Sequence, residues 1–201
     1  IQFIHDFSIQ FGWRPKGNLV EFNGALYGLT DQGGSNSHGV LFSLKTGTWA
    51  YSVLHNFNSI ADGRSPEYLM LKNGVLYGNC RGGGSFGGAL FKYGIDNSSF
   101  STMHLFTSVT GKNPSQLSDG NNGYLYGVTD QGGVGNQGTF YKIKLADGSF
   151  VKIADFNGTN ARFTKAGVFK AANGNNRNSR IQQWLYWIDR GQCLSSWYDL
   201  L

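Results

Sequence analysis

A unit of about 50 residues recurs along this chain of 201 residues, and the recurrence restricts the fold more than any other feature of the sequence. A tyrosine that follows leucine marks one position of the unit: Tyr27, Tyr77, Tyr126 and, in a weaker copy, Tyr186. A phenylalanine marks another position, at spacings of 50, 49 and 50: Phe7, Phe57, Phe106 and Phe156. Repeats with a period of roughly 20 to 50 residues are typical of solenoids and propellers.

Each copy of the unit is predicted to form four short strands. The first strand is expected just after the repeated proline, at residues 18–22, 68–72, 115–119 and 166–170. Asn-Gly pairs then favour a hairpin turn into the Leu-Tyr-Gly strand. The glycine of Leu-Tyr-Gly is expected where the chain leaves the sheet, so that Thr-Asp-Gln-Gly-Gly forms a loop. A third strand, a turn and a fourth strand ending at the repeated phenylalanine complete one propeller blade.

The spacing predicts a single all-β domain. We expect a β-propeller of four blades, each with four antiparallel strands, at approximately residues 8–57, 58–106, 107–156, and 157–201 plus 1–7. The first seven residues match the fourth strand of the unit and residues 195–201 match the third, so the N-terminal strand is expected to close the last blade and remove an exposed edge. Residues 174–201 fit the unit least well. Two alternatives remain open: a larger propeller, or closure through another copy of the chain.

The repeated motif also resembles a known family. Leu-Tyr-Gly-x-Thr-x-x-Gly-Gly, followed by Gly-Thr-x-Phe, Leu-His-x-Phe and a turn with proline, is similar to the GloVer-type tandem repeat of secreted and surface-anchored proteins. The resemblance extends from residue 1 to about residue 170. It implies an extracellular, β-propeller-like module, and it supplies no catalytic residues that could be assigned here.

Two kinds of loop are expected on one face of the propeller, the face on which propellers commonly bind ligands. They are the Gly-rich loop after the second strand and the proline loop that leads from one blade into the next. The candidate ligand-binding residues on these loops are Trp13, Arg14, Asp31, Gln32, Arg64, Arg81, Lys112, Asp130, Gln131 and Arg162. Trp13 is the candidate for stacking on a sugar.

Four basic residues of this set lie near the repeated proline or its equivalent: Arg14, Arg64, Lys112 and Arg162. At equivalent positions they would form a ring that attracts a carboxylate, sulfate or phosphate. The alternative is a solvated rim, in which Arg14 pairs with Asp31 and Lys112 pairs with Asp130. Exposed ion pairs of this kind contribute only about 0 to 1 kcal/mol.

Three histidines share one position, two residues before the repeated phenylalanine: His5, His55 and His104. Equivalent positions on the outer strands of different blades lie too far apart to bind one metal ion. We therefore expect these histidines to pack and to form hydrogen bonds. Neither a metal nor a cofactor is predicted.

The sequence contains no P-loop, no His-Glu-x-x-His motif and no Cys/His cluster with the spacing of metal ligands. The Gly-rich residues 82–88 lack the lysine and the helix of a phosphate loop. The leading hypothesis is a non-catalytic extracellular module that binds a ligand, glycan or protein, or builds a surface layer, through one loop face. The alternative is a propeller hydrolase, lyase or transferase, with Asp31 and Asp130 as carboxylates at the mouth of the tunnel.

The charge distribution limits the partners. The net charge is +5, yet the 17 basic residues are scattered, so no nucleic-acid surface is predicted. No apolar stretch reaches the roughly 18 residues of a membrane span. Cys80 and Cys193 lie at different positions of the repeat and are expected to be free thiols. A glycan, an anionic ligand or a protein is the expected partner, and the oligomeric state is left open.

Overall fold

A computed structural model describes residues 4–83, 87–157, 169–170, 185–189 and 192–194. Apart from one 3-10 turn at Val134–Asn136, the regular elements of these residues are β-strands. In chain order they are β1 (Trp13–Phe22), β2 (Ala25–Gln32), β3 (Val40–Lys45), β4 (Tyr51–Asn56), β5 (Arg64–Lys72), β6 (Val75–Gly82), β7 (Ala89–Gly94), β8 (Ser99–Leu105), β9 (Lys112–Pro114), β10 (Ser118–Asp119), β11 (Tyr124–Gln131), β12 (Thr139–Lys144), β13 (Phe150–Asp155), β14 (Phe169–Lys170), β15 (Leu185–Asp189) and β16 (Gln192–Leu194). The prediction of an all-β chain is confirmed.

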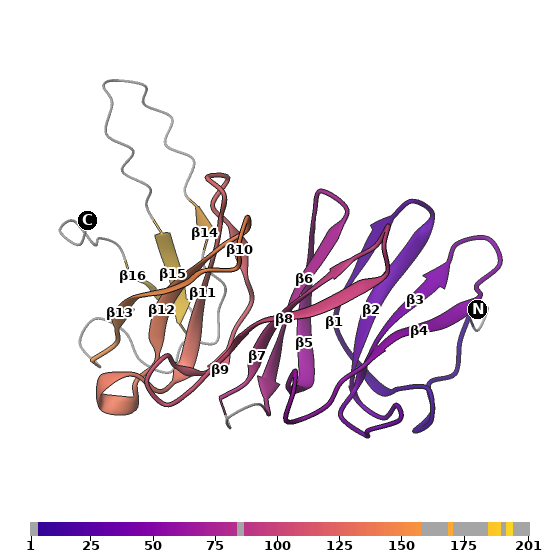
Figure 1. The fold of residues 1–201 in the computed structure, drawn as a ribbon, viewed down its shortest axis with the longest axis horizontal. Helices are drawn as coiled ribbons and strands as arrows, with labels where there is room; N and C mark the ends of the chain where they lie inside the picture. The colour runs from indigo at the N-terminus through magenta and orange to yellow at the C-terminus, as the bar shows by residue number, and fades with distance from the viewer. Residues whose placement is uncertain (1–3, 84–86, 158–168, 171–184, 190–191, 195–201) are drawn as a thin grey trace.

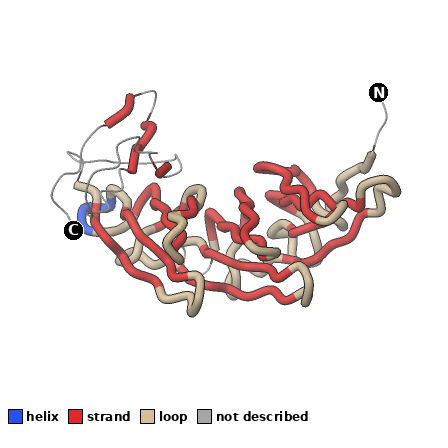
Figure 2. Tube along the Cα trace, turned by 90° about the horizontal axis from the view of Figure 1, so that it is seen from above, coloured by secondary structure: helices blue, strands red, loops and turns tan. Residues whose placement is uncertain are grey.

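The strands form successive antiparallel sheets, which we call blades. Blade 1 contains β1–β4 and blade 2 contains β5–β8, each in sequence order. Blade 3 contains β10–β13, and β9 pairs with the end of β11; β14–β16 form a further, three-stranded sheet. Figures 1 and 2 show the blades side by side along an open arc. The repeat therefore folds as an array of sheets of the propeller type.

The predicted closure of the ring is not seen among the described residues. Residues 195–201, the expected partner of the N-terminal strand, lie outside these residues, as do residues 1–3. Residues 4–7 form no strand, and the sheet of β14–β16 includes none of them. The count of four blades stays a prediction.

The first strand of each blade begins before the repeated proline, not after it. β1, β5 and β9 each start two residues ahead of the proline. The residue just before the proline has a left-handed φ in each blade: Arg14 (58°), Ser65 (54°) and Asn113 (54°). Beyond the proline the pairing register shifts in β1 and β5, and in blade 3 the strand divides into β9 and β10. The proline therefore marks a bulge inside a longer strand, which corrects the predicted strand starts.

The glycine of Leu-Tyr-Gly lies within the second strand, so the prediction that the chain leaves the sheet there is wrong. It faces an aromatic residue of the third strand in each blade: Gly28 with Phe42, Gly78 with Phe91, and Gly127 with Tyr141. A Cβ atom at any of these glycines would collide with the aromatic side chain. The glycine is required because it leaves room for a buried ring to lie across the strand.

Replacing Gly78 with alanine is expected to lower the free energy of unfolding by about 1 to 3 kcal/mol, because the new methyl group would displace the fully buried Phe91 ring. Chemical denaturation of the purified chain measures this change. Gly82, on the same strand, is the matched control, since a Cβ there would meet only the flexible side chain of Arg64. Equal losses for Gly78→Ala and Gly82→Ala would contradict the proposed role of the glycine.

The repeated phenylalanine lies at the boundary between blades. Phe57, Phe106 and Phe156 are at most 1% exposed. The Phe106 ring, which follows β8 of blade 2, lies edge-on to Tyr141 and Phe150 of blade 3, at centroid distances of 5.1 and 5.7 Å. This phenylalanine therefore joins the cores of neighbouring blades.

The three repeated histidines stack face to face on aromatic rings. The His55 ring lies 3.5 Å from Phe100 of blade 2, and the His104 ring lies 3.7 Å from Phe150 of blade 3. The His5 ring stacks in the same way on Tyr51 of blade 1 at 3.9 Å. The packing role predicted for these histidines is confirmed, and each contact of His55 and His104 joins two successive blades.

Candidate functional site

We define the loop face as the edge of the arc where the β2–β3, β6–β7 and β11–β12 loops meet the connections between blades, along the lower edge of Figure 1. Backbone hydrogen bonds join the two kinds of loop. Ser65 N, near the start of blade 2, donates to His38 O of blade 1 at 3.2 Å, and Asn113 N donates to Gly87 O at 2.7 Å. Both kinds of loop therefore meet on one face.

The Thr-Asp-Gln part of the motif belongs to strands β2 and β11 and not to a loop. This corrects the predicted loop, which begins only at the paired glycines. Thr30 explains why the strand continues: its hydroxyl accepts a hydrogen bond from Val40 N at 3.1 Å and donates one to Gln32 O at 2.9 Å. Asp31 and its equivalents are consequently held on rigid strand ends.

A chain of ion pairs begins in blade 1. Arg14 Nε lies 4.0 Å from Asp31 Oδ2, and Lys16 Nζ lies 3.9 Å from Asp31 Oδ1. Lys16 Nζ also lies 2.6 Å from Glu67 Oε1 and thereby joins blade 1 to blade 2. The Arg14–Asp31 contact is the one that the rim alternative predicted.

The chain of ion pairs continues into blade 3. Arg81 of blade 2 lies 3.8 Å from Glu67 Oε1 and donates a hydrogen bond to Asp130 Oδ2 at 3.1 Å. The predicted pairing of Lys112 with Asp130 is not formed, because Arg81 reaches Asp130 from the neighbouring blade. We call the six side chains the ion-pair network: Arg14, Lys16, Asp31, Glu67, Arg81 and Asp130.

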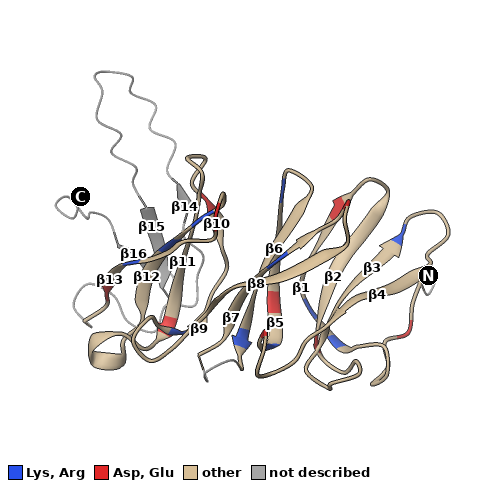
Figure 3. Cartoon of the chain, viewed as in Figure 1, with Lys and Arg blue, Asp and Glu red and all other residues tan. Residues whose placement is uncertain are grey.

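The signs of these charges alternate between blades. The residue after the proline is Lys16 in blade 1 and Glu67 in blade 2, whereas the paired position on the second strand is Asp31 in blade 1 and Arg81 in blade 2. Opposite charges therefore face each other within blades 1 and 2, across the boundary between these two blades, and across the boundary between blades 2 and 3. The network contains three cations and three anions and is neutral, and Figure 3 shows both signs interspersed among the strands.

Sequence reasoning missed Lys16 and Glu67. The sequence did contain a signal. The residue after the proline and the residue paired with it on the second strand both change the sign of their charge between the first and second copies of the repeat. The two carboxylates near Arg81 are buried: Glu67 is 8% exposed and Asp130 is 5% exposed. Asp130 Oδ1 accepts no hydrogen bond from the residues that the structure describes. Buried carboxylates are costly unless a cation compensates them, so Arg81 stabilises both.

The predicted ring of basic residues is out of register by one residue. Strand pairing places Arg64 opposite Gly82 and Lys112 opposite Gln131, which is the position that Trp13 holds opposite Gln32. Arg14 lies one residue further along, directly before the proline. Arg162 lies outside the described residues. The loop face therefore presents Trp13, Arg64 and Lys112 at one repeated position.

The residues at this repeated position are not part of the ion-pair network. Within the described ranges, neither Arg64 nor Lys112 makes a side-chain ion pair or hydrogen bond. Trp13 is 47% exposed, and the Arg14 guanidinium lies 6.0 Å from the centre of its ring. Gln32 and Gln131 lie beside them at the ends of β2 and β11. Trp13 and Arg64 are exposed, and Lys112, Gln32 and Gln131 are half-buried.

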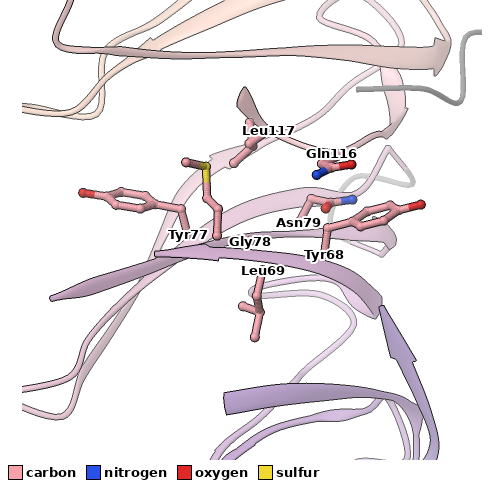
Figure 4. Close-up of a pocket in the computed structure, with 8 residues that line it drawn as sticks. Tyr68, Leu69, Tyr77, Gly78, Asn79, Gln116 and Leu117 are labelled. Atoms are coloured by element: carbon pink, nitrogen blue, oxygen red, sulfur yellow. The ribbon is translucent and has the colours of Figure 1, made fainter. Parts of the chain in front are cut away.

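A crevice lies between blades 2 and 3, away from the network. It is lined by Tyr68, Leu69, Met70, Tyr77, Gly78, Asn79, Gln116 and Leu117 (Figure 4). Asn79 directly follows the Leu-Tyr-Gly motif, at a position where the first and third copies of the repeat have an apolar residue. Its side-chain amide donates a hydrogen bond to Pro114 O at 2.7 Å. The crevice contains no space for a water molecule, so it serves as an interface between blades and not as a ligand site.

Burial lowers the pKa of His104 from its usual 6.5 to about 4, and its Nε2 contacts the Thr110 hydroxyl at 3.4 Å. The unfolded chain therefore binds more protons than the folded chain between these two pH values. Stability that is present above pH 6.5 is lost as the pH falls towards 4. We expect a contribution of about 1 to 2 kcal/mol, because the ring is partly exposed.

Thermal unfolding at pH 7.5 and pH 4.5 tests this dependence. In the variant His104→Phe, which keeps an aromatic ring against Phe150, the loss of stability between the two pH values should be smaller than in the parent chain. The same loss in both proteins would show that His104 does not contribute to acid sensitivity.

The described residues contain no obvious reactive centre. Cys80 is a free, fully buried thiol, and burial raises its pKa well above the usual value. The side chain of Cys193 lies outside the described part. No group of three histidine, cysteine or acidic side chains in the described ranges is arranged to hold a metal ion.

The described segments also include no helix with the length and apolar character of a membrane span.

Comparisons with known proteins agree with this architecture. Residues 1–177 match the profile of the Gloeobacter/Verrucomicrobia repeat. No curated protein sequence matches the chain. Among solved structures, that of a nidogen/laminin complex is similar with a TM-score of 0.55 and 13% identity, over 90% of this chain and 59% of that chain. TolB from Acinetobacter baumannii is similar with a TM-score of 0.51 and 11% identity, over 94% and 43%.

The chain spans about half the length of these two solved structures, which are β-propellers. At these identities the likeness shows the fold alone.

Proposed function

The chain belongs to the Gloeobacter/Verrucomicrobia repeat family, and from this premise we propose that it is a non-catalytic propeller module that binds another macromolecule through its loop face. The single observation that carries the proposal is the division of charged residues on that face. The six residues of the ion-pair network neutralise one another, whereas the exposed Trp13 and Arg64 and the half-buried Lys112 lie outside the network.

Further observations support a binding role. One of the similar propellers is nidogen, whose structure was solved in complex with laminin, a protein partner. The exposed Trp13 ring also keeps glycan binding as a second candidate. We place the module outside the cytoplasm, either secreted or at the cell surface, because few residues are charged and the motif resembles repeats of secreted proteins.

The propeller itself is proposed to have four blades. The N-terminal residues 1–7 would then pair with the last blade, as expected from their match to a fourth strand. A larger ring, or a ring shared with a second copy, is the alternative. Multi-angle light scattering together with cross-linking of cysteines introduced near both chain ends distinguishes these arrangements.

The enzyme alternative rests on Asp31 and Asp130. Both carboxylates are engaged by cations, and Lys16, Glu67 and Arg81 lie between them in the ion-pair network. Glycoside hydrolases need two carboxylates that face each other across one bond, typically about 5 to 10 Å apart. The ion pairs that Asp31 and Asp130 form therefore favour a structural role for these two carboxylates.

A glycan array, run beside a panel of hydrolase and lyase substrates, tests the proposed function. We expect no turnover of any substrate. Turnover by the parent chain that disappears in Asp31→Asn, while the variant remains folded, would establish the enzyme alternative. Arg14→Gln is the matched control, because it loosens the same ion pair but leaves the carboxylate in place.

A further inference from the structure

Exposed aliphatic side chains recur on the connections that lead into the blades. Ile9, Ile60 and Val109 are 68%, 80% and 67% exposed, and each lies three or four residues before the first strand of its blade. Single exposed aliphatic residues are common, but three at one repeated position on one face form a pattern. Val134, 75% exposed on the β11–β12 loop, adds a fourth to the same face.

Ile9, Ile60 and Val109 each precede one of the three residues Trp13, Arg64 and Lys112. Ile60 is followed by Arg64 and Val109 by Lys112, with a buried glycine in between. In blade 1 the corresponding residues are Ile9 and Trp13. The loop connecting two blades is short, so the aliphatic side chain and the cation emerge close together on the loop face.

Outside the network, the described residues of the loop face include Arg64 and Lys112 as unpaired cations, whereas the nearby carboxylates of Asp62 and Asp155 contact His55 and Lys152. Arg14, Lys16 and Arg81 are balanced by the three carboxylates that they contact. Arg64 and Lys112 have no acidic partner among the described residues. An accessible partner would therefore meet aliphatic side chains next to uncompensated cations.

We propose that the loop face binds a protein partner whose contact surface combines carboxylates with aliphatic side chains. The inference rests on the proposed function and names the chemistry of its partner. The repeated pair of an aliphatic residue and a cation favours a protein over a polysaccharide, because a polyanionic sugar chain offers carboxylates or sulfates but few aliphatic groups. Exposed isoleucine and valine would then bury their surface in the complex.

Selection from a display library of random 12-residue peptides provides the probe. Peptides that bind the parent chain are expected to be enriched in Asp and Glu next to Leu, Ile or Val. A synthetic peptide from the selection is then measured by calorimetry. Its affinity should fall about tenfold or more in Arg64→Ala/Lys112→Ala, and it should weaken as salt rises.

Three matched variants complete the experiment. Lys45→Ala/Lys92→Ala changes the net charge equally, at the end of β3 and on β7, and should leave the affinity unchanged. Ile60→Ser/Val109→Ser should weaken binding several-fold. Val151→Ser, on the exposed part of β13, should not weaken it. The folded state of each variant is checked by thermal unfolding.

The outcomes separate the inference from the function on which it rests. Peptides without acidic residues that still lose affinity in loop-face variants would overturn the inferred chemistry but keep the loop face as a binding site. If no loop-face variant changes the affinity of the selected peptides, or if no peptide is selected, two claims are overturned: the inferred chemistry of the partner, and the loop face as a site that binds a protein. Binding to heparin or alginate through Arg64 and Lys112, with no acidic peptide selected, would replace the protein by a glycan.

Discussion

Replacing Phe106 with alanine is expected to lower the free energy of unfolding by about 3 to 5 kcal/mol, the largest effect of any single substitution considered for this chain. Phe106 is fully buried, and its ring contacts Tyr141 and Phe150 of the next blade. Its removal would leave a cavity at the boundary where blades 2 and 3 share a core. Domains are stable by only about 5 to 15 kcal/mol, so the loss would be a large share of the total.

Denaturation with urea measures this loss. Tyr141→Phe is the matched control in the same cluster. It removes a buried hydroxyl that has no hydrogen-bond partner among the described residues and keeps the ring. We expect the control to leave stability unchanged or to raise it, because an unsatisfied polar group is removed. A loss below about 1 kcal/mol for Phe106→Ala would show that the blades do not depend on this contact.

Removing Arg81 is expected to have the second largest effect. Arg81→Ala leaves Asp130 without its cation and takes one of two cations from Glu67. Loss of one partner from a buried pair costs about 3 to 5 kcal/mol, and the partial exposure of Arg81 reduces our expectation to about 2 to 3 kcal/mol. A double-mutant cycle with Asp130→Asn isolates the interaction, and its coupling free energy should be about 1 to 2 kcal/mol.

An exposed pair gives the comparison for this cycle. Lys144 Nζ, at the end of β12, lies 3.0 Å from Asp147 Oδ2 on the turn that follows, and the two side chains are 44% and 49% exposed. The cycle between these two residues should give a coupling free energy within the error of the measurement, because solvent screens an exposed pair. Equal coupling in the two cycles would contradict the structural role given to the network.

The array of four-stranded sheets was predictable from the sequence because it depends on local features. The spacing of tyrosines and phenylalanines reports the period of the unit. Asn-Gly pairs and alternating apolar residues locate the hairpins. The predicted third and fourth strands correspond to β3 and β4, β7 and β8, and β12 and β13. Packing of the repeated histidines was also foreseen, because equivalent positions in different blades cannot converge on one ion.

Features that depend on contacts between strands were not predictable. Gly28 and its equivalents were predicted to lie where the chain leaves the sheet. Their role depends instead on the aromatic ring of the paired strand. Arg14 stands one residue before its proline, whereas Arg64 and Lys112 stand two residues before theirs, and the strand pairing has the same register at all three prolines. The sequence did not show that the first strand begins before the proline, so it did not show which of these residues share a position.

The candidate site was predicted only in part for the same reason. Arg14, Asp31, Arg81 and Asp130 were identified as residues of the loop face, but their partners across the blade boundaries were not. Lys16 and Glu67, which directly follow the prolines, were not among the predicted site residues. Only the arrangement of blades showed that these two side chains meet at 2.6 Å.

The central claim is that the charged residues of the loop face divide into a structural network and a binding set. One comparison tests it most directly: the unfolding free energy and the affinity for a selected acidic peptide, both measured for Arg81→Ala and for Arg64→Ala/Lys112→Ala. We predict that Arg81→Ala loses stability but binds the peptide with nearly the parent affinity when folded, whereas the double variant keeps its stability and loses affinity about tenfold. The reverse assignment, or loss of both properties in both variants, would contradict it.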